Sequence, residues 1–172
     1  GHEKVQVLGG GMHAAIDAGF PTERGAPTSA PVPPYPGVTE WPRELLLDAD
    51  AYAALVADPS RLAIDVRAPS RFRGEEDAFD PNPGHVPGAI NAFYESNLDA
   101  AGRFLSAEQL AAKYRALPGD RAPSALAVQC GSGVTACHTL LALERAGLHG
   151  ARLYVGSFSE WTRQGRAVAS GE

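Results

Sequence analysis

The sequence contains few cysteines, and this shortage narrows the classes of protein to which it can belong. Cys130 and Cys137 are the only two, which is too few for a disulfide framework. They form no C-x-x-C motif, and no histidine pair at metal-ligand spacing accompanies them, so no metal site is expected. Free thiols are typical of a reducing compartment, and we expect a cytoplasmic protein.

Basic residues and long apolar runs are also scarce. The formal net charge is −5 at pH 7, so we expect no basic surface for nucleic acid. No apolar run approaches the roughly 18 residues that span a bilayer, and the chain does not start with a leader pattern, so no membrane partner is expected. Lys4 and Lys113 are the only lysines, and this preference for arginine suggests a bacterial source.

The 172 residues are 44% hydrophobic, which is enough for one domain with its own core. Short apolar runs alternate with helical patterns, and Asp48 and Ser106 are the expected helix N-caps. This alternation predicts an α/β fold, a three-layer domain with a mostly parallel central sheet and helices on both faces. The predicted elements are strands at 61–66, 88–93, 124–130 and 151–156, and helices at 48–58, 106–117 and 135–147.

The N-terminal part of the chain differs from the rest. Residues 21–37 carry six prolines and predict an extended linker. Before it, VLGGGMHAAIDAG (7–19) parallels LYVGSFSEWTRQG (153–165), and each predicts a strand, a glycine turn, a short helix and a terminating glycine. We therefore expect residues 1–21 to be the tail of a preceding domain of the same kind, 22–37 a linker and 38–172 the main domain. A generic strand–turn–helix is the alternative.

The run C-G-S-G-V-T at 130–135 lies between a predicted strand and a predicted helix. Gly131 and Gly133 allow a tight turn that aims backbone N–H groups inward, and the start of the helix adds partial positive charge. Both favour a thiolate, so we expect the pKa of Cys130 to lie below the usual value of about 8.5. Since parallel sheets bind ligands beyond the carboxyl ends of their strands, Cys130 is the candidate nucleophile.

The segment also fits interpretations other than a nucleophilic cysteine. A cysteine at a strand end is often buried and inert. A protein tyrosine phosphatase carries an arginine at the sixth residue after its nucleophile, and here Ala136 occupies that position, which disfavours phosphoryl transfer. For Cys137 and His138 we expect packing roles in the helix, with a redox partner or a base as the alternatives.

The loop CGSGVTAC (130–137) resembles the active loop of the rhodanese superfamily, in particular that of the catalytic domain of tandem-domain 3-mercaptopyruvate sulfurtransferases. IDVRAPSRFRGE (64–75) and GHVPGAINAF (84–93) resemble two further elements of the same family. These motifs occur in the family's order and extend over most of residues 38–172. The resemblance implies a rhodanese-like fold.

The resemblance also implies roles for individual residues. Cys130 is the sulfur acceptor that becomes a persulfide, Ser132 lies near the departing pyruvate, and Arg71 contacts the anionic substrate. A fixed guanidinium suits a carboxylate, and Arg71 follows the predicted strand 61–66, so it can face the same edge of the sheet. A surface arginine in a loop is the alternative. The remaining assignments are Gly131, Gly133, Val134 and Thr135 as the substrate-binding loop, and Asp65 with Arg67 as a supporting ion pair.

The implied activity is transfer of sulfur from 3-mercaptopyruvate, through the Cys130 persulfide, to a thiol such as thioredoxin or glutathione, or to cyanide. No metal or organic cofactor is expected, because the protein itself carries the sulfur. The implied partners are a small anionic sulfur donor and a thiol acceptor. We also expect the domain to pack against its own N-terminal rhodanese domain when that domain is present.

Two alternatives to this activity stay open. The first is a thiosulfate sulfurtransferase, although divalent thiosulfate favours cations beside the cysteine and the pair Gly131–Ser132 is neutral. Residues 75–83 also lack the basic residue that mercaptopyruvate enzymes often carry there. The second alternative is a sulfur-carrier or interaction module that holds a persulfide but turns over slowly with small donors.

Overall fold

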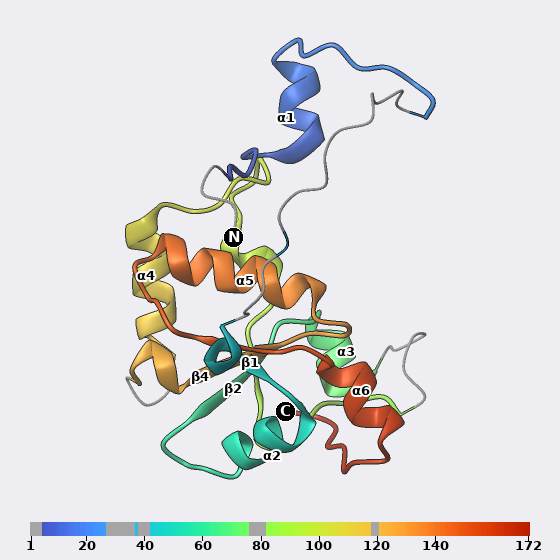
Figure 1. The fold of residues 1–172 in the computed structure, drawn as a ribbon, viewed down its shortest axis with the longest axis vertical. Helices are drawn as coiled ribbons and strands as arrows, with labels where there is room; N and C mark the ends of the chain where they lie inside the picture. The colour runs from blue at the N-terminus through green and yellow to red at the C-terminus, as the bar shows by residue number, and fades with distance from the viewer. Residues whose placement is uncertain (1–4, 27–36, 38–41, 76–81, 118–120) are drawn as a thin grey trace.

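A five-stranded sheet forms the centre of the protein (Figure 1). The computed structural model describes residues 5–26, 37, 42–75, 82–117 and 121–172. All strand pairings are parallel, in the order β1-β5-β4-β2-β3, and parallel neighbours require crossover connections, which the helices supply. The strands are β1 (Leu46–Leu47), β2 (Leu62–Asp65), β3 (Ile90–Asn91), β4 (Leu126–Gln129) and β5 (Arg152–Tyr154).

One face of the sheet is covered by α4 (Ala107–Arg115) and α5 (Val134–Arg145). Side chains of a strand point alternately to its two faces, so every second residue of β2 and β4 contributes to this core. The large aliphatic residues of these two strands lie here, and each is less than 9% exposed. From the two central strands they are Leu62, Ile64, Leu126 and Val128.

The opposite face carries small residues at the intervening strand positions, Ala63 and Ala127. They share a core cluster with Tyr52 and Tyr154, whose rings stack with centroids 4.5 Å apart. Such ring pairs contribute roughly 0.5–1.5 kcal/mol beyond the burial of their area. Helices therefore cover both faces, and the predicted α/β architecture is confirmed. The helices of this second face are α2 (Ala49–Val56), α3 (Pro69–Arg73) and α6 (Ser157–Arg163).

The predicted elements coincide well with those of the structure. Each predicted strand contains one of β2 to β5, the predicted helices 48–58 and 106–117 contain α2 and α4, and α5 begins one residue before the predicted helix 135–147. Asp48 caps α2 by accepting from the Ala51 N–H, and Ser106 forms a capping box with Gln109. The patterns did not predict β1, α3 or the short 3-10 helices, since segments of two to five residues carry little periodicity. The 3-10 helices are Arg43–Leu45, Tyr94–Asn97 and Pro123–Ala125.

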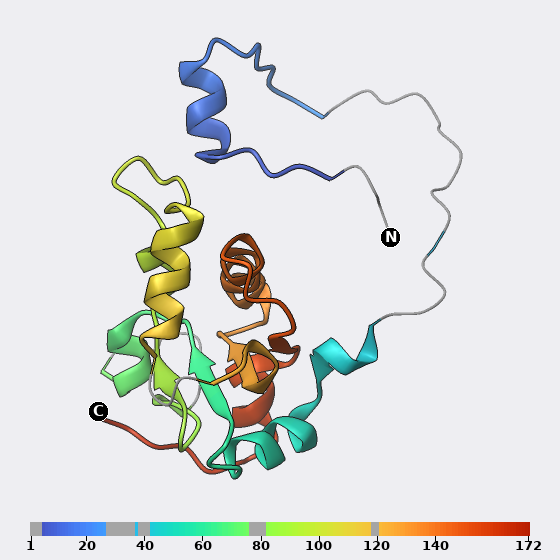
Figure 2. The same cartoon turned by 90° about the vertical axis from the view of Figure 1, so that its left-hand side faces the viewer.

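The N-terminal segment projects from the sheet domain (Figure 2). It contains α1 (Gly11–Asp17), which agrees with the predicted helix, but residues 5–8 form no strand, so that part of the prediction is wrong. Most of the predicted linker, residues 27–36, lies outside the described residues. None of the helices described is both long and apolar enough to cross a membrane.

Candidate active site

The loop that begins at Cys130 lies at the carboxyl edge of the sheet. Strand β4 ends at Gln129, and α5 begins at Val134. The neighbouring strand β2 ends in register with it, because Asp65 pairs with Gln129. The segments that follow the two strands therefore meet at one edge, where parallel sheets bind their ligands. In Figure 1, α3 and α6 lie at the end of α5 where this helix begins.

The sulfur of Cys130 is buried, since the residue is 2% exposed, and it is surrounded by hydrogen-bond donors. The Gly133 N–H donates to Sγ across 3.2 Å. Burial acts to raise the pKa of the Cys130 thiol, but hydrogen bonds from the Thr135 hydroxyl and from the N–H groups of Ala136, Ser132 and Gly133 outweigh it. The pKa of Cys130 is therefore lowered, which favours the thiolate.

Two glycines give the loop its shape in different ways. Gly133 is the N-cap of α5 with φ 88°, and a Cβ added there would lie 2.7 Å from the Val155 carbonyl oxygen. Gly131 has no such strain, but a Cβ on it would lie 3.5 Å from a side chain of another segment, that of Arg71. Ser132 lies between the two glycines and is exposed. Val134 follows them and is 72% exposed.

Arg71 reaches the loop from α3. The sequence suggested a loop position for this residue, whereas it stands in a short helix that starts with Pro69 and ends at Gly74, which adopts φ 78°. The Nη2 and Nη1 atoms of Arg71 lie 3.5 and 3.6 Å from the point that a Cβ of Gly131 would occupy. The guanidinium thus lies beside Gly131 of the cysteine loop.

Asp65 and Arg67 form a buried ion pair under the site. The Arg67 Nη2–Asp65 Oδ2 distance is 2.8 Å, and the two side chains are 1% and 0% exposed. Arg67 Nη2 also donates to the Gly84 carbonyl at 2.6 Å, and its guanidinium lies 3.9 Å from the centre of the Phe158 ring. Gln129 Nε2 donates to Asp65 Oδ2 at 3.0 Å. The pair therefore joins the ends of β2 and β4.

A third segment contacts the loop, and the sequence did not reveal its function. The start of α6, residues 157–159, begins 27 residues after Cys130. The Phe158 N–H donates to the Cys130 carbonyl at 3.0 Å, and the Ser159 N–H donates to the Gly131 carbonyl at 2.9 Å. The Ser157 hydroxyl accepts from the Cys130 N–H at 3.2 Å. The sequence pattern at 153–165 predicted the glycine turn and the short helix, but not their contact with the cysteine loop.

The other candidate residues lie away from the sulfur. Cys137 is exposed on α5, and its thiol pKa is raised, first by burial and then by the charge of Cys130. The His138 ring packs on Phe104, with centroids 4.5 Å apart, and its pKa is lowered by burial and by the charge of Lys113. Within the described parts of the chain, no three His, Cys, Asp or Glu side chains converge as they would around a metal ion.

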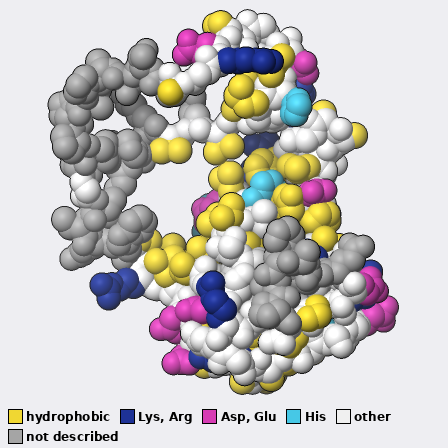
Figure 3. All heavy atoms as spheres, turned by 90° about the vertical axis from the view of Figure 1, so that its right-hand side faces the viewer, with side chains coloured by type: hydrophobic (Ala, Val, Ile, Leu, Met, Phe, Trp, Pro, Cys, Tyr) yellow, Lys and Arg dark blue, Asp and Glu magenta, His cyan; other side chains and the backbone are white. Residues whose placement is uncertain are grey.

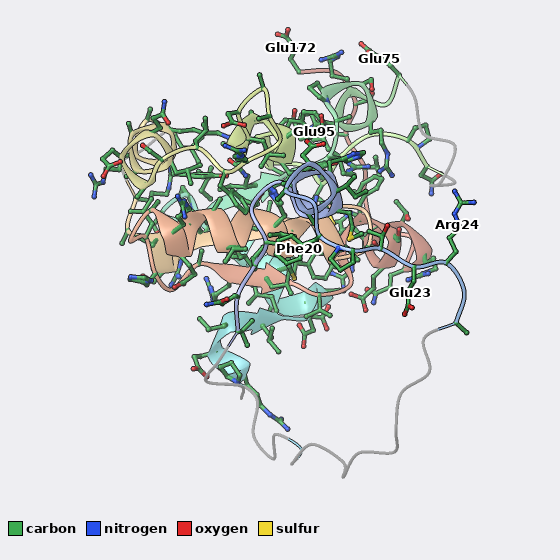
Figure 4. The ribbon with its side chains drawn as sticks, turned by 90° about the horizontal axis from the view of Figure 1, so that it is seen from above. Phe20, Glu23, Arg24, Glu75, Glu95 and Glu172 are labelled. Carbon is green, nitrogen blue, oxygen red and sulfur yellow. The ribbon has the colours of Figure 1, made fainter. Side chains whose placement is uncertain are left out.

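The acidic stretch after α3 begins at the periphery. Glu75 accepts two hydrogen bonds from Arg73, each 2.8 Å long, and both side chains are more than a third exposed. Figure 4 shows Glu75 at the same edge of the molecule as Glu172, far from the N-terminal segment that carries Phe20. Residues 76–81 lie outside the described part of the chain. Arg73 thus interacts with exposed acidic side chains at this edge.

Comparison with known proteins agrees with this geometry. Residues 48–164 match the family model described as the Rhodanese-like domain. The chain belongs to the rhodanese family. The matched region of this rhodanese chain contains the whole cysteine loop, Arg71 on α3 and all of α6.

Curated relatives of the rhodanese chain are named as sulfurtransferases. A Pseudomonas aeruginosa protein named "Probable 3-mercaptopyruvate sulfurtransferase" is 43% identical over 169 residues, which is 98% of this chain and 58% of the relative. "Thiosulfate sulfurtransferase" of Gallus gallus is 31% identical, with 94% of this chain and 54% of the relative covered. "3-mercaptopyruvate sulfurtransferase" of Rattus norvegicus is 30% identical, with the same coverage. The chain therefore spans little more than half the length of these relatives.

Solved structures agree with the fold. A variant of EanB in complex with ergothioneine superposes with a TM-score of 0.83 at 21% identity, covering 99% of this chain and 42% of that one. Another EanB variant, in complex with hercynine, gives a TM-score of 0.84. At this identity the likeness shows a shared fold, and function is inferred from the site itself.

Proposed function

We propose that this rhodanese chain is the catalytic part of a sulfurtransferase that carries sulfur on Cys130. The single observation that supports this most is the convergence of donors on one buried sulfur, with the Gly133 N–H 3.2 Å from Sγ. Such a pocket stabilises negative charge on sulfur before the reaction, as a thiolate, and after it, as a persulfide anion. The names of the relatives support the same class of reaction.

The donor that we propose is 3-mercaptopyruvate. The Cys130 thiolate attacks the donor sulfur, and an S–S bond forms while the C–S bond breaks. The electron pair of the broken bond passes to carbon as the enolate of pyruvate, which takes a proton from solvent. The transferred sulfur then loses its thiol proton to solvent, which leaves the persulfide anion. Ser132, exposed beside Cys130, donates to the departing enolate oxygen. An acceptor thiol or cyanide then takes the outer sulfur, and the Cys130 thiolate is restored.

Arg71 binds the carboxylate of the donor in this mechanism. Its guanidinium lies beside Gly131, which leaves the loop opening free of a side chain. A planar guanidinium can donate two parallel hydrogen bonds to a carboxylate and fix its orientation. Gly131, Gly133 and Thr135 hold the sulfur through the loop, and exposed Val134 forms an apolar rim. Asp65 and Arg67 support the loop from below and take no part in the chemistry.

The choice of 3-mercaptopyruvate over thiosulfate is supported by the loop. Thiosulfate is divalent, whereas Arg71 brings a single positive charge beside Gly131, and Gly131 and Ser132 are neutral. The relative with 43% identity carries the mercaptopyruvate name as well. We propose that the sulfur needs no metal or organic cofactor, and that thioredoxin or glutathione in the cytoplasm accepts it.

We further propose that residues 1–21 are the tail of a preceding rhodanese domain, 22–37 a linker and 38–172 the catalytic domain. Helix α1 and helix α6 each have seven residues and are followed by Gly19 and Gly165, with φ 76° and 67°. Figure 3 shows hydrophobic side chains gathered on the N-terminal lobe and on the body next to it. A preceding domain would cover this apolar surface. The large hydrophobic residues of the segment that are exposed are Val5, Val7, Leu8, Met12, Ile16 and Phe20.

Intact-mass spectrometry tests the proposed activity. The protein is incubated with 3-mercaptopyruvate or with thiosulfate, and the variants Cys130→Ser and Cys137→Ser are treated in parallel. We expect a gain of one sulfur atom with 3-mercaptopyruvate, which Cys130→Ser abolishes and Cys137→Ser retains. Steady-state transfer to cyanide then measures turnover.

Each other outcome points to a different function. A gain with thiosulfate alone identifies a thiosulfate sulfurtransferase. A persulfide that forms but transfers slowly to every small acceptor identifies a sulfur-carrier module. If neither donor adds sulfur, the chain as given is not a competent sulfurtransferase.

A further inference from the structure

Ser157 has a backbone conformation that serine rarely adopts. Its φ is 52°, and among the described residues it is the only one other than glycine with a positive φ. In this region a residue with a side chain is strained. Gly11 begins helix α1 as Ser157 begins α6, and it has φ 59°. A glycine thus adopts the same turn without strain, so the presence of a serine at position 157 needs a physical explanation.

The reason lies in what the Ser157 hydroxyl contacts. The residue is completely buried, and its Oγ donates to the Tyr154 carbonyl at 3.0 Å. Because a hydroxyl has one proton, this bond fixes its direction and leaves the oxygen to accept from the Cys130 N–H at 3.2 Å. The hydroxyl therefore connects the end of β5 to the backbone of the proposed nucleophile.

The neighbouring groups extend this connection along the loop. The N–H groups of Phe158 and Ser159 hold the carbonyls of Cys130 and Gly131. On the far side of the loop, Gly133 passes so close to the Val155 carbonyl that no side chain fits between them. The segment 154–159 thus determines where the loop lies, while the groups that bind the sulfur belong to the loop itself.

We propose that Ser157 is a positioning residue, which holds the Cys130 backbone so that the loop N–H groups converge on Sγ. This rests on the proposed function of Cys130 but adds a residue that never touches the substrate. Without the hydroxyl, the Cys130 N–H loses its acceptor, and the loop keeps only two of its three hydrogen bonds to residues 157–159. The donors around the sulfur then misalign, and the thiolate is less well stabilised.

Two variants separate the hydroxyl from the backbone strain. Ser157→Ala removes the hydroxyl and keeps a strained side chain, whereas Ser157→Gly removes the hydroxyl and relieves the strain. Thr162→Val is the matched control. Thr162 is 4% exposed on the same helix, and its hydroxyl donates to the Phe158 carbonyl at 3.0 Å without reaching the loop. All three changes remove one buried hydroxyl from α6.

The readout is the pH dependence of Cys130 alkylation by iodoacetamide, followed on the full chain by peptide mass spectrometry. Alkylation of exposed Cys137 on the same chain serves as an internal reference for the activity of the reagent and for unfolding of the protein. The charged side chain beside the loop, Arg71, is the same in every variant. We expect both Ser157 variants to move the alkylation midpoint upward by roughly 0.5–1 pH unit and to slow persulfide formation about tenfold. Thr162→Val is expected to leave both unchanged.

Two results would overturn the role of Ser157. One is a wild-type midpoint in Ser157→Gly, the variant expected to fold with less strain than Ser157→Ala. The other is an equal shift in Thr162→Val, which would mean that general loosening of α6 is responsible. Alkylation needs no sulfur donor, so this test reports on Ser157 even if the chain transfers no sulfur.

Discussion

Arg71 and Gly131 face each other across the opening of the cysteine loop, with Nη2 3.5 Å from the point that a glycine Cβ would occupy. The two residues are 60 positions apart in the sequence (131 − 71). Arg71 follows β2 and Gly131 follows β4, and these two strands are parallel neighbours in the sheet. A cation thus lies next to a position with no side chain, and the residue before that position carries the buried sulfur. This arrangement suits a small donor that carries a carboxylate at one end and sulfur at the other.

Replacing Arg71 by methionine tests its role in substrate binding. We expect the KM for 3-mercaptopyruvate to rise roughly 10- to 100-fold, because the carboxylate loses its charged partner. Arg71→Lys is expected to recover only part of the loss, since an ammonium lacks the two-pronged geometry. Arg73→Met is the matched control, as Arg73 belongs to the same helix but pairs with exposed Glu75. An unchanged KM in Arg71→Met would exclude Arg71 from the binding site.

Thr135→Val removes one of the hydrogen bonds that lower the pKa of Cys130. Burial raises the pKa of Cys130, and with one hydrogen bond fewer to offset burial the pKa of this thiol rises. Since the thiolate is the reactive form, kcat/KM should begin to fall at a higher pH as the solution is acidified. We expect the acid limb to move upward by roughly 0.5–1 unit, with the rates converging in alkali.

The matched control for this change is Thr139→Val. Thr139 is also buried on α5, but its hydroxyl accepts from Asn97 and does not contact the sulfur. Its pH profile should coincide with that of the wild type. Coincident profiles for both variants would mean that Thr135 does not stabilise the thiolate.

Gly133→Ala should weaken the fold where Gly131→Ala does not. Gly133 has φ 88°, and an added Cβ would meet the Val155 carbonyl oxygen at 2.7 Å, so we expect the free energy of unfolding to fall by about 1–3 kcal/mol. At Gly131 the added Cβ makes an ordinary contact at 3.5 Å, and a change within about 0.5 kcal/mol is expected. Urea unfolding measures both. Equal losses at the two positions would refute the distinction.

Asp65→Asn tests the buried ion pair. It leaves the Arg67 guanidinium, 1% exposed, without its carboxylate, and losses of about 3–5 kcal/mol are typical for such changes. The exposed pair of Arg73 and Glu75 is the control, and Glu75→Gln should barely move the urea midpoint. If Asp65→Asn unfolds at the wild-type urea concentration, the pair contributes no net stability.

The sequence alone determined much of this protein because its signals are local. Apolar runs predicted the central strands β2 and β4, and Asp48 and Ser106 correctly indicated two helix starts. Glycines around Cys130 indicated a turn that presents backbone donors, and the lowered pKa of the thiol agrees. These features depend on neighbours within a few residues, so a linear pattern is enough to predict them.

Only the tertiary structure decided what surrounds the loop. The two-residue strand β1 exists through its pairing with β5, and α3 places Arg71 beside Gly131 across 60 residues (131 − 71) of sequence. Ser157 acts on Cys130 through a hydrogen bond between segments 27 residues apart. No local propensity specifies such contacts, because their free energy arises only when the sheet and its crossover helices have packed.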